Sequence, residues 1–159
     1  MNRYLIIADD FTGANDTGVQ MRRRGFQTVV VFPGKNAAVG ENASKVIDTE
    51  SRGLPGEEAA SVTAASVAQV KFDDYKYVIK KVDSTLRGNL AEEIRAVDAA
   101  FGSELVIFAP ALPDLNRTTV GGVHLLRGVP ITQTELAKDP RKPVTEDRLA
   151  EILKQVYTE

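Results

Sequence analysis

Short apolar runs separated by helical patterns constrain the fold of this chain more than any other feature. Each run is rich in aliphatic residues, has the length of a strand, and lacks the polar alternation of a strand with one face in water. The runs span residues 4–9, 27–32, 45–48, 76–82 and 104–109. Helices are predicted at 14–24, 55–70, 89–101 and 145–157. Repeated strand–helix units of this kind predict a three-layer α/β domain, with a mainly parallel sheet and helices on both faces.

The pattern changes after residue 110. Residues 118–131 read as antiparallel strands with glycine turns, which predicts a late β-hairpin excursion with one turn at Arg127 and Gly128. Small and polar residues at 35–43 predict a loop. A length of 159 residues fits one domain, so residues 1–159 are expected to form a single unit.

Composition argues against several classes of function. A net charge of −2 is unfavourable for a general nucleic-acid or membrane-surface partner. The chain has no cysteine, and its single histidine, His124, cannot form a histidine-rich metal site; we expect it to be structural and expect no metal here. The sequence contains neither a membrane-spanning apolar stretch nor a signal-peptide pattern, so a cytoplasmic location is expected.

Polar side chains gather where two of the predicted strands end. Asp9 and Asp10 follow the first run directly. Two adjacent carboxylates repel each other and need a cationic or hydrogen-bonding partner, although either one is also suited to cap the following helix. Because ligands of parallel α/β sheets bind outside the carboxyl ends of the strands, these residues are candidates for a binding site.

A second polar cluster follows the fourth run and has the same position relative to its strand. Its candidate site residues are Lys81, Asp83, Ser84, Thr85 and Arg87. A small anionic ligand with several hydroxyl groups needs partners of these kinds for its oxygens. Lys81 is the weakest candidate, because side-chain alternation along a strand favours its pointing towards a sheet face.

Four motifs occur in one order along the chain: IADDFTGANDTG near the start, DTESRG at 48–53, KKVDSTLRGN at 80–89, and APALPDLNRTTVGGVHLLRGVPI followed by a DP-x-x-PV segment at 139–144. Together they resemble the N-terminal domain of the four-carbon acid sugar kinases, which include 3-oxo-tetronate, threonate and erythronate kinases. The resemblance covers nearly the whole chain. It implies an acid-sugar-binding domain whose C-terminal ATP-binding domain is absent here. ATP and Mg²⁺ are then expected in the full-length enzyme, and none on this chain alone.

Two arginines are candidates for holding the carboxylate of an acid sugar. Arginine binds a carboxylate through two parallel, charge-assisted hydrogen bonds. Arg52 follows the third run and matches a substrate-contact position of the resembling family. Arg87 follows the fourth run, and either it contacts the ligand or it holds Asp83 or the Asp9–Asp10 pair in place.

Hydroxyl groups of the sugar are expected to meet carboxylates and hydroxyls of the chain. Asp9, Asp10, Asp83, Ser84 and Thr85 supply these groups. A kinase also needs a group that orients the attacking hydroxyl and accepts its proton. Asp10 and Asp83 are the candidates for this catalytic base, and the sequence does not separate them.

Phosphate-binding loops of the common kinds are absent from the sequence. It contains neither G-x-x-x-x-G-K-[ST] nor a G-x-G-x-x-G that follows a strand, and Gly121-Gly122 is interpreted as a bend in the hairpin. This absence favours a substrate domain whose isolated form is inactive and, with one wall of its cleft exposed, prone to form a homo-oligomer.

Three alternatives remain. The first is a non-catalytic module that binds acid sugars. The second is an aspartate-dependent phosphatase. The spacing disfavours it, because such enzymes have one residue between their two aspartates, whereas Asp9 and Asp10 are adjacent. The third is a ribokinase-like kinase, suggested by Thr12-Gly13-Ala14-Asn15-Asp16, but that motif lies late in those chains.

Overall fold

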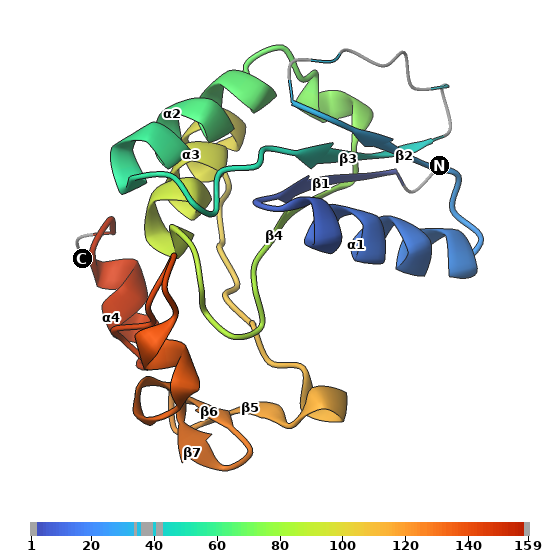
Figure 1. Cartoon of the computed structure of the whole chain (residues 1–159). Helices are drawn as coiled ribbons and strands as arrows, with labels where there is room; N and C mark the ends of the chain where they lie inside the picture. Colours follow the sequence, from blue (N-terminus) through green and yellow to red (C-terminus); the bar gives the residue numbers. More distant parts are fainter. Residues whose placement is uncertain (1–2, 34, 36–39, 41–42, 158–159) are drawn as a thin grey trace.

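A computed structural model of the chain describes residues 3–33, 35, 40 and 43–157 (Figure 1). The loop predicted at 35–43 therefore lies mostly outside the described residues. Four strands form a parallel sheet in the order β2-β3-β1-β4, as the apolar runs predicted. They are β1 (Tyr4–Ala8), β2 (Thr28–Val31), β3 (Ser44–Asp48) and β4 (Tyr77–Lys81).

Helices cover both faces of this sheet, which confirms the three-layer prediction (Figure 1). They are α1 (Phe11–Arg23) on one face, and α2 (Gly56–Val67) and α3 (Leu90–Phe101) on the other. Alternate residues of β1 point to opposite layers, so Ile6 packs with Met21 of α1 while Leu5 and Ile7 pack with Val67 and Val97. Burial on both faces explains why β1 is uniformly apolar.

Two predicted helices have different boundaries from those expected. Helix α1 begins at Phe11, because Asp10 caps it by accepting a hydrogen bond from the Gly13 N–H at 2.9 Å. Helix α4 is only Leu149–Lys154, shorter than the predicted 145–157. The backbone before α4 pairs with the hairpin instead, through His124 N to Asp147 O at 2.8 Å and a bridge between Val123 and Arg148.

The prediction of a strand at 104–109 was wrong. In Figure 1 this segment passes beside β4, with which it forms no ladder. Residues of both segments line an apolar groove of about 490 Å³. Leu105 and Ile107 are 74% and 79% exposed, while Phe108 packs against the core around Leu90. The apolar run of the segment is strand-like, but pairing also depends on where the next part of the chain is anchored.

The hairpin excursion predicted after residue 110 is present. Its strands are β5 (Arg117–Val120), β6 (Val123–Leu126) and β7 (Val129–Pro130), paired antiparallel. Arg127 and Gly128 both have positive φ, of 53° and 80°, which confirms the predicted turn. The short 3₁₀ helices are Phe72–Asp74, Pro113–Leu115, Ile131–Gln133 and Glu135–Lys138.

The hairpin region packs on the loop between β4 and α3 through a second core. This core contains Leu86, Leu90, Leu126, Ile131, Val144 and Ile152. It brings residues 139–142 close to the ends of the parallel strands. Among the described residues, no helix is long and apolar enough to cross a membrane.

Candidate functional site

The carboxyl ends of β1, β3 and β4 lie side by side at one edge of the sheet. Ala8 at the end of β1 is in register with Asp48 of β3 on one side and Lys81 of β4 on the other. The three loops that leave these strands therefore begin at neighbouring points. This confirms the prediction that the polar clusters share one edge.

Arg52, in the loop after β3, binds both aspartates that follow β1. Its Nε and Nη2 donate to Asp9 Oδ2 and Oδ1 at 2.7 and 3.0 Å, and its Nη1 donates to Asp10 Oδ2 at 2.6 Å. Asp9 is 1% exposed, so it needs this partner. Burial alone would lower the pKa of Arg52, but the bonds to Asp9 outweigh it and the pKa is raised. Arg52 thus provides the cation that two adjacent carboxylates require.

A buried polar network holds the loop that carries Arg52. Ser51 Oγ donates to Glu93 Oε1 of α3 at 2.8 Å, and Lys80 forms an ion pair with Glu93 at 2.8 Å. Asn89 Nδ2 donates to the carbonyls of Ser51 and Leu54, each at 3.1 Å. The sequence analysis missed Glu93, whose only signal is a carboxylate on the apolar face of a predicted helix.

Asp83 and Arg87 form a further ion pair, in the loop after β4. Arg87 Nε donates to Asp83 Oδ2 at 2.6 Å, and Thr85 donates to the same oxygen through its Oγ1 at 2.6 Å. Burial would raise the pKa of Asp83, but the hydrogen bonds from Thr85 and Arg87 outweigh it and the pKa is lowered. Arg87 thus holds Asp83 in place, as one of the alternatives expected, and its contact with a ligand stays a prediction. Arg87 Nη1 also lies 3.5 Å from Asp139 Oδ2.

The hairpin fixes Ser84 from the other side. Arg117 Nη1 donates to Ser84 Oγ at 2.7 Å, and His124 Nε2 donates to the Ser84 carbonyl at 2.9 Å. The other ring nitrogen of His124 accepts from Thr119 Oγ1 at 3.0 Å, and the histidine is fully buried. His124 thus has the structural role that the sequence predicted.

Lys81 lies beneath the start of α1. Its Nζ donates to the Val82 carbonyl at 2.6 Å. Burial lowers the pKa of Lys81, and the carboxylates of Asp9 and Asp83 partly offset that effect. Lys81 therefore offsets part of the negative charge of Asp9 and Asp83 from inside the domain.

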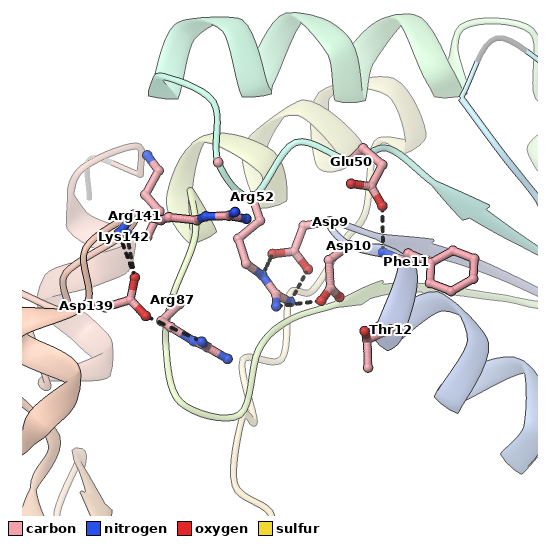
Figure 2. A pocket seen from close by; sticks show the side chains of 11 residues that line it. Asp9, Asp10, Phe11, Thr12, Glu50, Arg52, Arg87, Asp139, Arg141 and Lys142 are labelled. Carbon is pink, nitrogen blue, oxygen red and sulfur yellow. Dashed lines mark hydrogen bonds and ion pairs between the residues drawn. The ribbon is translucent and has the colours of Figure 1, made fainter.

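A charged cavity of about 420 Å³, the first cavity, opens over the Asp9–Arg52 pair. Figure 2 shows Asp9 and Asp10 pointing to Arg52, with Arg87 and the turn at 139–142 on the opposite side. The lining residues are Asp9, Asp10, Phe11, Thr12, Glu50, Arg52, Gly53, Arg87, Asp139, Arg141 and Lys142. Four predicted site residues are thus brought together here: Asp9, Asp10, Arg52 and Arg87. The other four do not line it: Lys81, Asp83, Ser84 and Thr85.

The turn at 139–142 contributes residues that the sequence analysis did not select as site residues. Asp139 Oδ1 accepts the backbone N–H groups of Arg141 and Lys142, both at 2.9 Å, and these bonds lower the pKa of Asp139. Lys142 Nζ donates to Asn89 Oδ1 at 2.7 Å. In the part of the chain that the structure describes, neither Arg141 nor Lys142 has an ion pair with a carboxylate. Their only sequence signal was the DP-x-x-PV segment that contributed to the family resemblance.

Residues 3–33, 35, 40 and 43–157 contain no group of three or more histidine, cysteine, aspartate or glutamate side chains that is arranged to hold a metal ion. The first cavity instead places cations beside carboxylates at the ends of parallel strands. Such a cavity has the chemistry to bind a small ligand that carries both negative charge and hydroxyl groups.

Fold and site together define a three-layer α/β domain with a charged, ligand-sized cavity at its strand ends. The chain belongs to the family of sugar-binding N-terminal domains, whose sequence model matches residues 4–159.

Known relatives agree with this membership. The chain is 40% identical over 152 residues to a D-threonate kinase of Salmonella typhimurium, covering 95% of this chain and 36% of the relative. It is 37% identical over 158 residues to a D-erythronate kinase of Heliobacterium modesticaldum, covering 96% of this chain and 36% of the relative.

A solved structure of a Bordetella bronchiseptica protein has the same fold. It superposes with a TM-score of 0.87 at 35% identity, covering 94% of this chain and 39% of that one. That protein is a domain-swapped dimer with bound citrate. The chain thus spans a little over a third of the length of each of these relatives.

Proposed function

We propose that this chain is the substrate-binding part of an ATP-dependent kinase for a four-carbon acid sugar, and that the acid sugar binds in the first cavity. The proposal rests on one observation: cations and carboxylate acceptors lie on facing sides of the first cavity. Arg141 and Lys142 are cations without a carboxylate partner in the described structure, and Asp10 and Glu50 face them as acceptors. A four-carbon acid sugar has one carboxylate and several hydroxyl groups, which match these two sides.

Arg141 and Lys142 are the better candidates for holding the ligand's carboxylate. Three of the five N–H donors of Arg52 are already used on Asp9 and Asp10, which leaves two for a ligand. Arg52 therefore acts mainly by fixing Asp9 and Asp10. The Bordetella relative has bound citrate, which is also a small carboxylate with a hydroxyl group, and this supports a small hydroxy acid as the class of ligand.

Asp10 is favoured over Asp83 as the group that accepts the proton of the reacting hydroxyl. Both aspartates already accept hydrogen bonds from an arginine, but Asp10 lines the first cavity and its side chain is 22% exposed, whereas Asp83 is absent from the lining. A base must reach the hydroxyl that it deprotonates. The hydroxyl would then lie on the side of the cavity remote from Arg141 and Lys142.

The nucleotide and Mg²⁺ are proposed to be held by a domain outside residues 1–159. No phosphate loop of a common kind is present in the sequence, and the described residues hold no cluster suited to a metal. With no common phosphate loop in the sequence and no metal-holding cluster among the described residues, no step is assigned to the nucleotide or its metal on this chain.

Isothermal calorimetry with D-threonate and D-erythronate tests the proposal. D-threitol, which has hydroxyl groups but no carboxylate, is the matched control ligand. We expect one or both acids to bind and threitol not to bind. Lys142→Ala and Arg141→Ala should each weaken acid binding by at least about tenfold. Equal binding of threitol, or no effect of either substitution, would overturn the assignment of the carboxylate to this turn.

A coupled assay for ADP release tests whether this chain alone has kinase activity. The chain of residues 1–159 should give no turnover with ATP and the same acids, because phosphoryl transfer needs charge stabilisation around the γ-phosphate. The expected pair of results is binding without turnover by this chain, and turnover by a full-length relative that has the equivalent domain. Turnover by residues 1–159 alone would contradict the placement of the nucleotide site in another domain.

A further inference from the structure

Unlike Arg52, Arg87 and Arg127, Arg117 has no acidic partner in the described structure. Arg52, Arg87 and Arg127 each form an ion pair with a carboxylate. Arg117 donates only to the hydroxyl of Ser84, at 2.7 Å, and its buried Nε has no hydrogen-bond partner. Removing a guanidinium from water without a compensating anion is unfavourable, so this charge is a candidate for binding an external anion.

A second cavity, of about 450 Å³, lies beside Arg117 where the hairpin packs on the β4–α3 loop. Arg87, Arg117 and Arg127 line it, and its carboxylates are Asp114 and Glu135. Glu135 is already paired with Arg127 at 2.8 Å. Arg87 is paired with Asp83, so the charges of this lining without an ion pair in the described structure are Arg117 and Asp114, which form no ion pair with each other.

The two cavities have one wall in common. Arg87 lines both the first and the second cavity, and Thr85 next to it lines the second. Ser84, in the loop that follows β4, is bonded to Arg117 and His124 of the hairpin. An anion at Arg117 would therefore be a close neighbour of whatever occupies the first cavity.

We propose that the second cavity is a subsite for a phosphate group, with Arg117 as its main ligand and Arg87 at its flank. The planar donors of arginine match the oxygens of a phosphate, and a phosphate would supply the anionic partner that Arg117 lacks in the described structure. The phosphate belongs either to a phosphorylated sugar acid or to a nucleotide. This subsite rests on the contacts of Arg117 itself, and it holds whether or not an acid sugar binds in the first cavity.

Titration of the ¹⁵N-labelled chain with inorganic phosphate, followed by ¹H–¹⁵N NMR, tests the subsite. Saturable shifts are expected at Asn116, Arg117 and Ser84. Arg117→Ala should weaken phosphate binding by at least about tenfold, and Arg117→Lys should weaken it less, because the charge remains and the planar fork is lost. Ser84→Ala keeps the guanidinium and should bind phosphate within about threefold of the wild type, so it controls for loss of the Arg117–Ser84 contact.

Arg141→Ala is the matched control, since it removes a cation without an ion pair from the first cavity. It should leave the phosphate shifts at Arg117 in place while weakening D-threonate binding, which tests the two sites separately. Shifts centred on residues 139–142 instead, or no saturation up to about 50 mM phosphate, would overturn the proposal.

Competition identifies the source of the phosphate. Displacement of inorganic phosphate by a phosphorylated four-carbon acid supports the subsite and assigns the phosphate to the sugar. Displacement by ATP supports it and assigns the phosphate to the nucleotide. Displacement by neither compound would contradict a role for the subsite in binding phosphate esters.

Discussion

Arg52 and Asp9 are joined by two parallel hydrogen bonds, Nε to Oδ2 at 2.7 Å and Nη2 to Oδ1 at 3.0 Å, which tie the loop after β3 to the end of β1. The same loop is fixed through its backbone, since Arg52 N donates to Asp9 O at 3.0 Å. Asp9 is almost completely buried, so the pair is a structural support for the floor of the first cavity.

Arg52→Ala is expected to lower the free energy of unfolding by roughly 3–5 kcal/mol, because it leaves the Asp9 carboxylate buried without a partner. Arg52→Lys should recover only part of this, since lysine cannot form the two parallel bonds. Urea denaturation of both variants measures the effect. The double variant Arg52→Ala/Asp9→Asn should be more stable than Arg52→Ala alone. Additive losses would show that the pair does not act as a unit.

Asp48 should make stability depend on pH between about 4 and 6. Its Oδ2 is buried without a partner, and burial raises its pKa from the ordinary 3.8 to about 6. Because the folded-state pKa is the higher one, the protonated carboxyl stabilises the fold below pH 4. That contribution, up to about 3 kcal/mol, is lost as the pH rises through 6.

Asp48→Asn isolates this effect, since it keeps an oxygen for the Glu50 N–H, which Asp48 Oδ1 accepts at 3.1 Å. Thermal unfolding of both proteins from pH 4 to pH 8 is the measurement. The variant should lose less stability than the wild type over this range. Parallel curves for the two proteins would mean that Asp48 does not titrate there.

The apolar groove between β4 and residues 104–109 should cause self-association of the chain. Leu105 and Ile107 are largely exposed next to a sheet edge, and such edges pair with other chains. Leu105→Glu/Ile107→Lys is expected to shift the wild-type species towards monomer in sedimentation velocity. Val120→Lys, at a hairpin residue that is 64% exposed, is the control and should change nothing. Identical profiles for the wild type and the double variant would exclude this groove as the contact.

Local sequence patterns were enough to predict the sheet and part of the site. The apolar runs at β1 and β4 and the aspartates after them determined the edge where Asp9 and Asp10 lie. The segment at 104–109 has the same kind of pattern, but its pairing depends on tertiary position. Residues 139–142 reach the first cavity only because a second core, around Ile131 and Val144, folds the hairpin region back on the β4–α3 loop. No local pattern encodes that approach.

A crystal structure of residues 1–159 with D-threonate most directly tests the central claim, that an acid sugar binds in the first cavity with its carboxylate at the 139–142 turn. The account predicts the carboxylate within hydrogen-bonding distance of Arg141 or Lys142, and a hydroxyl within reach of Asp10. Threonate bound in the reverse orientation, or bound outside the first cavity, would contradict it.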